Sequence, residues 1–359
     1  MSQPTPQSSP PRGAAPLPIA APVPGAAPLA AAPATTRRAV IQVQHVSKSF
    51  GDSMGVDDIN FEVYEGEIFG FIGPSGSGKT TTMRLLNGIY TPSSGTVNLL
   101  GANPAHPTRA LHEGFGYMPQ QFVLYANLTV YENINFLAAV QGLGWRERRG
   151  QIKRMLDFVE LWEARNRLAA NISGGMQRRL ELASSLIHNP RLLFVDEPTA
   201  GIDPVLRGKF WEEFRHLRDR GRTIFVTTQY VGESEYCDRV GVIRKGKLLA
   251  VETPLALRRL AMHGDVVDLE AAALTGDAVH NLLIQPYVVK EAGKPLYQWL
   301  AYPTTIRIHV TEAGDTIPQI LSLLQAADIA VTSLQEYRPT FDEVFIQLMG
   351  GPDSADPEA

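Results

Sequence analysis

The sequence predicts an α/β fold in which a mainly parallel sheet is followed by a small α+β domain. Apolar strand patterns alternate with helical patterns from about residue 40 to 255, and this alternation is typical of βαβ units. One of the strands ends in a glycine-rich turn that opens a helix. Beyond residue 255 the chain changes to short strands and helices that carry no recognisable chemical motif. The length of 359 residues is sufficient for both units.

The elements follow from the spacing of apolar residues. Short runs rich in Val, Ile, Leu and Phe predict strands, and apolar residues spaced by three and four predict helices. In the first unit the predicted strands are 40–43, 59–63, 67–72, 192–195 and 223–227. The predicted helices there are 80–86, most of 129–169, 177–187 and 210–217. In the second unit, predicted strands at 266–269, 288–289, 306–310 and 331–334 alternate with helices at 316–326 and 340–349.

Composition limits the possible functions. The chain has 33 basic and 37 acidic residues, so it lacks the general cationic field of a nucleic-acid binder, and we expect no nucleic-acid partner. The single cysteine, Cys237, can form neither an internal disulfide nor a zinc site alone. No run reaches the roughly 18 to 20 apolar residues that cross a bilayer, so we expect the chain either to be soluble or to reach a membrane only through a partner.

The two ends differ from the rest of the chain. Residues 1–38 are rich in proline and alanine without a periodic apolar face, and they are predicted to form a disordered arm. The tail at 351–359 is polar and acidic and is predicted to be frayed. Between them we expect a first domain at 39–255 and an accessory α+β domain at 256–350.

The first chemical motif is a phosphate-binding loop between a predicted strand and a predicted helix. It matches GxxxxGK[ST], in which glycines let successive backbone N–H groups face phosphate oxygens. The helix adds its positive N-terminal end. Lys79 is expected to reach the β- and γ-phosphates, and the Thr80 hydroxyl is expected to bind Mg²⁺. The predicted nucleotide-binding residues are Gly73, Pro74, Ser75, Gly76, Ser77, Gly78, Lys79, Thr80 and Thr81.

Two acidic residues follow the apolar run 192–195. Asp196 is expected to hold Mg²⁺, directly or through water. Glu197 can reach the water in line with the γ-phosphate, as a general base or as an orienting group. An apolar run before two acids is common by itself. The phosphate loop upstream is what favours the catalytic interpretation.

A third motif lies between these two, at 171–177. Its sequence Asn-Ile-Ser-Gly-Gly-Met-Gln opens a predicted helix and resembles the signature motif of ATP-binding cassette (ABC) ATPases, usually LSGGQ. Ile172 and Met176 depart from that pattern, whereas Ser173, Gly174 and Gly175 are kept. The resemblance implies an ABC ATPase core with a helical subdomain at about 120–185. It also implies that this turn closes over the γ-phosphate bound to a second subunit.

The resemblance extends to four further positions. Phe50 matches the aromatic residue that stacks on adenine, and Gln120 matches the glutamine that contacts Mg²⁺ and the attacking water. The adjacent Gln121 leaves that second assignment open by one residue. Asp203 matches the loop that contacts the opposite subunit. Where the family has a histidine near the γ-phosphate, this chain has Gln229, whose amide can donate a hydrogen bond but cannot take a proton at neutral pH.

Taken together, the motifs predict an ATP-hydrolysing subunit of an ABC exporter. The stretch from Ser173, the residues at 227–230 and the segment 341–345 resemble the drug- and lipid-export branch, in which the permease is often a separate chain. The resemblance implies a dimer, expected to be a homodimer, around two ATP-Mg²⁺, bound to a permease at the cytoplasmic face of the membrane. The alternatives are a soluble ABC ATPase acting on nucleic acid or ribosomes, and a purely regulatory nucleotide binder, which Glu197 disfavours.

Overall fold

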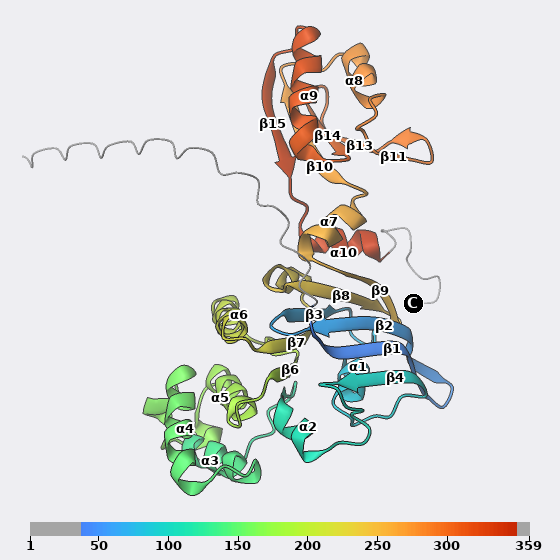
Figure 1. Cartoon of the computed structure of the whole chain (residues 1–359). Helices are drawn as coiled ribbons and strands as arrows, with labels where there is room; N and C mark the ends of the chain where they lie inside the picture. Colours follow the sequence, from blue (N-terminus) through green and yellow to red (C-terminus); the bar gives the residue numbers. More distant parts are fainter. Residues whose placement is uncertain (1–36, 350–359) are drawn as a thin grey trace, which may run out of the picture. The chain divides into compact units, whose positions relative to one another are not determined.

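The computed structural model describes residues 37–349. The predicted tail at 351–359, and all but the last two residues of the predicted arm at 1–38, lie outside the described residues. Within the described range the expected α/β core is present, followed by a second unit with an antiparallel sheet of its own (Figure 1). No helix between residues 37 and 349 is long and apolar enough to cross a membrane.

The central sheet has six strands in the order β5-β6-β7-β3-β8-β9. Five are parallel, and β9 pairs antiparallel with β8 at one edge. β3, β6 and β7 are buried along their whole length, which is why apolar residues fill their middles without alternation. Their buried polar residues, Asp196, Thr223, Thr227 and Thr228, stand at strand ends. The strands are β5 (Phe115–Met118), β6 (Leu192–Asp196), β7 (Thr223–Thr228), β3 (Ile68–Ile72), β8 (Arg239–Arg244) and β9 (Lys247–Glu252).

A smaller antiparallel sheet packs on the central one. Its strands, in the order β2-β1-β4, are β2 (Ser53–Tyr64), β1 (Ala39–Phe50) and β4 (Ser94–Leu99). Side chains of both sheets and of α1 (Lys79–Leu86) share one apolar core. At its centre, the rings of Phe61, Phe69, Phe71, Phe194 and Phe225 lie with neighbouring centroids 5.5–6.1 Å apart. A second core includes the buried Trp211 and Phe214 of α6 (Pro204–Asp219).

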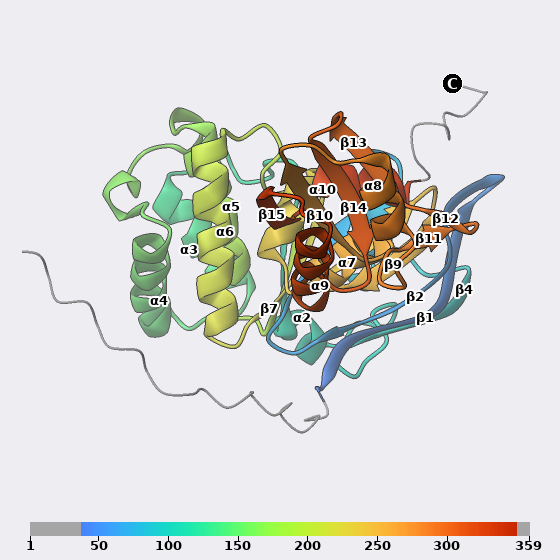
Figure 2. The ribbon, with the colours of Figure 1, turned by 90° about the horizontal axis from the view of Figure 1, so that it is seen from above.

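Helices between the strands β5 and β6 form the expected helical subdomain, which is visible in Figure 2 as the group around α3, α4 and α5. The main helices are α3 (Val130–Val140), α4 (Trp145–Phe158) and α5 (Gly174–Leu186), and a separate apolar core joins them. Thr129 and Glu132 form a capping box that fixes where α3 begins. The short helices η1 (Trp162–Ala164) and η2 (Ala169–Asn171) link α4 to α5, and α2 (Arg109–Gly114) precedes β5.

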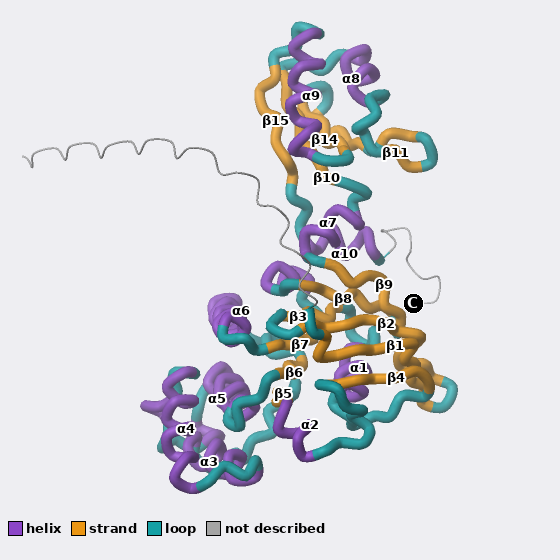
Figure 3. Tube along the Cα trace, in the orientation of Figure 1, coloured by secondary structure: helices purple, strands orange, loops and turns teal. Residues whose placement is uncertain are grey.

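The second unit contains a four-stranded antiparallel sheet in the order β13-β14-β10-β15, seen with its helices in Figure 3. Its strands are β10 (Asp265–Ala271), β13 (Tyr297–Ala301), β14 (Thr305–Val310) and β15 (Val331–Tyr337), with a small hairpin of β11 (Lys290–Glu291) and β12 (Lys294–Pro295). Its helices are α7 (Pro254–Ala261), α8 (Gly276–Leu283), α9 (Ala313–Ala326) and α10 (Phe341–Leu348). α10 packs against α7 and against η3 (Val231–Tyr236) of the first unit.

Both units contain elements that the sequence analysis missed. In the first unit the strands β4, β5, β8 and β9 and the helix α2 were not predicted. The predicted strand at 288–289 is wrong, because Val288 forms only an isolated bridge to Val310 and the pairing does not continue. In the second unit α7, α8, β13 and the hairpin of β11 and β12 were not predicted. α8 has only eight residues and depends on burial of Val279 and Leu282 in the core of this unit, which no local pattern indicates. The domain division at residue 255 stays a prediction.

Candidate active site

The phosphate loop follows β3 and ends at α1, as the motif requires. Gly76 and Gly78 have φ angles of 75° and 110°, which glycine adopts readily and other residues rarely do. Gly73 is required for a different reason. A Cβ atom there would lie 2.3 Å from the carbonyl oxygen of Ile243, so any side chain would displace backbone. These glycines let the chain pass closely behind the loop and turn directly into the helix.

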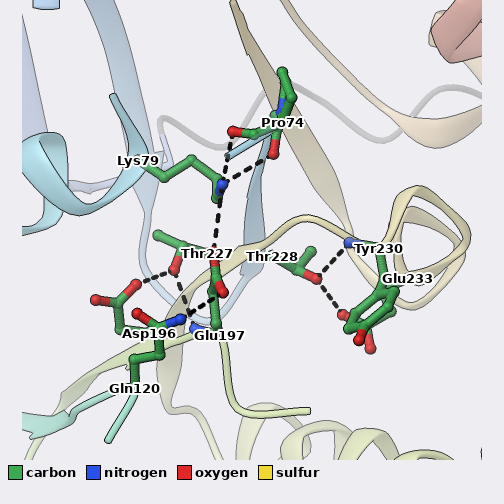
Figure 4. A network of polar contacts seen from close by, with 10 residues as sticks. Pro74, Lys79, Gln120, Asp196, Glu197, Thr227, Thr228, Tyr230 and Glu233 are labelled. Carbon is green, nitrogen blue, oxygen red and sulfur yellow. Dashed lines mark hydrogen bonds and ion pairs between the residues drawn. The ribbon is translucent and has the colours of Figure 1, made fainter. Parts of the chain in front are cut away.

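Lys79, the first residue of α1, is almost fully buried. Its ammonium donates hydrogen bonds to the carbonyl oxygens of Gly73 and Pro74, at 2.9 and 3.0 Å. It also lies 3.4 Å from Oε1 of Glu197 (Figure 4). The loop therefore holds its cation against a buried carboxylate from the end of a neighbouring strand.

Asp196 and Glu197 lie at the carboxyl end of β6, beside β7. The Thr227 hydroxyl of β7 donates to the Asp196 carboxylate, and burial of Asp196 raises its pKa. The Glu197 backbone N–H donates to the Thr227 carbonyl oxygen at 3.0 Å. Glu197 adopts a left-handed backbone conformation, with φ 45°, where the chain leaves the strand. Thr227 thus positions both acids, and the sequence motifs gave no indication of it.

Gln120 lies in the segment after β5. Its side-chain N–H donates to Oε2 of Glu197 at 2.9 Å, so Glu197 has Lys79 on one oxygen and Gln120 on the other. Both Gln120 and its neighbour Gln121 are exposed, but the hydrogen bond to Glu197 comes from Gln120. Of the two glutamines, it is therefore Gln120 that the structure brings to the acid. Arg178 of α5 donates to the backbone carbonyls of Pro119 and Gln120, a link that the sequence analysis missed.

Phe50 ends β1 and is 44% exposed. Its ring meets that of Tyr90 edge to face at 5.2 Å, and the Lys48 ammonium lies 5.3 Å from its centroid. A Cβ atom on Gly55 would lie 2.9 Å from the Phe50 ring and 3.1 Å from the Thr81 methyl group, so this surface adjoins the start of α1. Tyr90 and Gly55 lie against the ring of Phe50, the residue predicted to stack on adenine. No pattern in the sequence indicated either of them.

The turn containing Ser173 caps α5. The Ser173 hydroxyl accepts a hydrogen bond from the backbone N–H of Met176 at 3.3 Å. Gly174 and Gly175 line a hollow of about 460 Å³ together with the loop at 200–203, which contains Asp203. The phosphate loop is not among the walls of this hollow. The chain therefore brings the turn and Asp203 together, on a surface separate from Lys79.

Gln229 follows the last residue of β7 and is exposed. β7 lies between β3 and β6, so the segment after it emerges between the phosphate loop and the two acids. Parallel strands bring Lys79, Asp196, Glu197, Gln120 and Gln229 to one edge of the sheet although they are up to 150 residues apart. This edge is where α/β sheets bind ligands.

Comparison with known proteins agrees with the motifs. The family described as ABC transporter matches residues 56–200. The "Nod factor export ATP-binding protein I" of Rhizobium sp. (strain N33) is 34% identical over 318 residues, which are 87% of this chain and 98% of that protein. The chain belongs to the ABC transporter family, as an ATP-binding subunit. The predicted class of enzyme, an ABC-type transport ATPase, and its fold are confirmed.

Two further relatives define the extent of the ABC match. The "Probable multidrug ABC transporter ATP-binding protein YbhF" of Escherichia coli (strain K12) is 39% identical over 234 residues, and this chain spans only 40% of its length. The structure titled "Dimeric structure of a post-hydrolysis state of the ATP-binding cassette MJ0796 bound to ADP and Pi" is 26% identical, with a TM-score of 0.55. The match covers 59% of this chain and 98% of the chain in that structure. These relatives give no support to the nucleic-acid or ribosome alternative.

Proposed function

We propose that this ABC ATPase hydrolyses ATP to drive export through a separate membrane permease, working as a homodimer. The observation that carries the proposal is the placement of Glu197 at the carboxyl edge of the sheet, held by Lys79 and Gln120. The named relatives act in multidrug transport, Nod factor export and linearmycin resistance, which supports an exporter.

The residues of the site fit ATP with Mg²⁺. Thr80 and Asp196 supply a hydroxyl and one carboxylate, with Gln120 close by. Within residues 37–349 no group of three or more His, Cys, Asp or Glu side chains could hold a metal alone. A site so poor in protein ligands suits Mg²⁺, which keeps waters and phosphate oxygens as ligands. When bound, the ion would neutralise charge on the β- and γ-phosphates.

Hydrolysis requires a water molecule to attack the γ-phosphorus while the bond to the β-phosphate oxygen breaks. We assign Glu197 as the group that accepts the proton of this water, and Gln120 as the group that orients it. Lys79 would leave the Gly73 and Pro74 carbonyls for the phosphate oxygens. Gln229 would donate a hydrogen bond to the γ-phosphate, because a glutamine amide cannot take the proton.

A second copy supplies the remaining contacts in this proposal. Ser173 and Gly174 are exposed at the N-terminus of the 13-residue helix α5, where backbone N–H groups favour an anion. Because the turn and the phosphate loop occupy separate surfaces of one chain, the turn would close over the γ-phosphate held by the other copy. Asp203, beside that turn, would contact the opposite subunit.

The permease would dock beside Gln120. Val123, Tyr125 and Phe136 are exposed by 63%, 52% and 42%, and the last two rings meet edge to face at 5.1 Å. Exposed apolar side chains grouped in this way are typical of protein interfaces. Binding there would hold the ATPase at the cytoplasmic face of the membrane, and motion of the Gln120 segment would pass to the permease.

Substitution Glu197→Gln tests the proposal. The variant should bind ATP, fail to hydrolyse it and accumulate as an ATP-loaded dimer, because the proton acceptor is lost while the phosphate contacts remain. Phosphate release and size-exclusion chromatography with Mg²⁺-ATP measure both effects. Glu113→Gln, at a half-exposed surface acid, is the matched control and should behave as wild type. Hydrolysis by Glu197→Gln at the wild-type rate would show that the assignment is wrong.

A further inference from the structure

A buried carboxylate lies beside the proposed catalytic groups without taking part in their chemistry. Glu233, in η3, is 2% exposed. Its Oε1 accepts a hydrogen bond from the Thr199 hydroxyl, and its Oε2 accepts one from the Thr228 hydroxyl, both at 2.6 Å. Hydroxyl–carboxylate bonds of this length are charge-assisted and strong. A single side chain therefore bridges two segments that are almost 30 residues apart.

Both segments carry a proposed catalytic residue. Thr199 is two residues beyond Glu197, in the turn where the Ala200 N–H donates to the Glu197 carbonyl oxygen. Thr228 is the last residue of β7 and directly precedes Gln229. The Glu233 carboxylate thus connects the segment after Glu197, the proposed proton acceptor, to the residue before Gln229, the proposed hydrogen-bond donor to the γ-phosphate.

The segment around Gln229 is fixed on its other side as well. The Tyr230 backbone N–H donates to the same Thr228 hydroxyl at 3.0 Å, as Figure 4 shows. The Arg207 guanidinium lies 4.1 Å from the Tyr230 ring centroid, and its Nε lies 3.6 Å from Oε1 of Glu233. The carboxylate therefore has a cation nearby that balances its charge, and the residues on both sides of Gln229 belong to one cluster.

A buried carboxylate is costly to desolvate, and apolar residues of similar size could fill the same space without that cost. What the carboxylate adds is geometry, because its two oxygens accept from two hydroxyls at a fixed separation. We propose that Glu233 is a positioning residue, which holds Gln229 and the Glu197 segment at the separation that hydrolysis needs. This inference rests on the proposed function, since it assumes that both residues act on ATP.

The experiment compares Glu233→Ala, Glu233→Gln and Glu235→Ala in the full chain. Glu235 is the matched control, because it lies in the same short helix, its side chain is 58% exposed, and its carboxylate pairs with Arg258 rather than with the two threonines. Three quantities are measured for each protein: kcat, the dissociation constant for ATP, and amide hydrogen exchange in the segments 73–86, 197–203 and 227–233.

We expect Glu233→Ala to lower kcat at least about tenfold, because misplacement of catalytic groups by about 1 Å can cost as much as a hundredfold. Its dissociation constant for ATP should change less than about twofold, since no phosphate contact is removed. Exchange should accelerate in 197–203 and 227–233 but not in 73–86. Glu233→Gln should retain most of kcat, because a threonine hydroxyl can rotate to accept from the amide. Glu235→Ala should match wild type.

Two results would overturn the inference. One is Glu233→Ala with wild-type kcat and wild-type exchange. The other is a Glu233→Ala protein that binds ATP more weakly and loses protection from hydrogen exchange equally in all three segments. That result would indicate a merely structural role. A wild-type protein that does not hydrolyse ATP would instead refute the proposed function. The exchange comparison would then still decide whether Glu233 joins the two segments.

Discussion

The contact between Lys79 and Glu197 predicts a measurable coupling in the protein without added nucleotide. The two charged atoms are 3.4 Å apart, and the side chains are only 4% and 11% exposed. We consider Lys79→Met and Glu197→Gln, alone and together. Each change removes one charge with little change in side-chain length, so the difference between the double variant and the sum of the single ones isolates the pair.

The magnitude follows from the distance and the burial. At an effective dielectric constant of about 20, unit charges 3.4 Å apart attract by about 5 kcal/mol. The desolvation cost of each group is present both in the wild type and in one single variant, so it cancels in the cycle and does not lower the coupling. Lys79 retains the Gly73 and Pro74 carbonyls, and Glu197 retains the Gln120 amide. We therefore expect a coupling free energy of about 2 kcal/mol.

Urea denaturation of the four proteins at pH 7 measures the coupling. The exposed pair Arg109–Glu113 provides a control cycle on the same chain, and its coupling should be below about 0.5 kcal/mol. One molar salt should abolish the control coupling and leave most of the buried one, because buried pairs are screened much less. A Lys79–Glu197 coupling no larger than that of the control would refute the reasoning.

Three further predictions concern single residues. Burial raises the pKa of the Asp196 carboxyl in the folded protein, so ionisation of this carboxyl lowers the free energy of unfolding as pH rises through that pKa. Asp196→Asn should therefore have a higher melting temperature than wild type at pH 7, and the difference should shrink toward pH 4. Phe50→Ala should weaken ATP binding by about 1 kcal/mol in titration calorimetry, while Phe50→Tyr should not. Phe225→Ala should lower the free energy of unfolding by about 3–5 kcal/mol in urea, whereas a loss under 1 kcal/mol would contradict the central place of this ring.

Much of the catalytic edge could be predicted from chain order. Lys79, Asp196 and Gln229 each follow an apolar run, and the carboxyl ends of parallel strands meet at one edge of a sheet. The choice between Gln120 and Gln121 could not be predicted in this way. They are neighbours with the same chemistry, and only the course of the segment after β5 brings the first one to Glu197.

Glu233 shows most clearly where sequence reasoning stops. It stands two residues before Glu235 in a short polar stretch, and no pattern distinguishes the two acids. The structure separates them by tertiary packing, because η3 directs one carboxylate into the interior and leaves the other 58% exposed. The same short helix packs against α10, where Phe341 and Val344 are buried. The predicted C-terminal domain therefore contacts the element that carries Glu233, a connection between residues more than 100 positions apart that only the folded chain reveals.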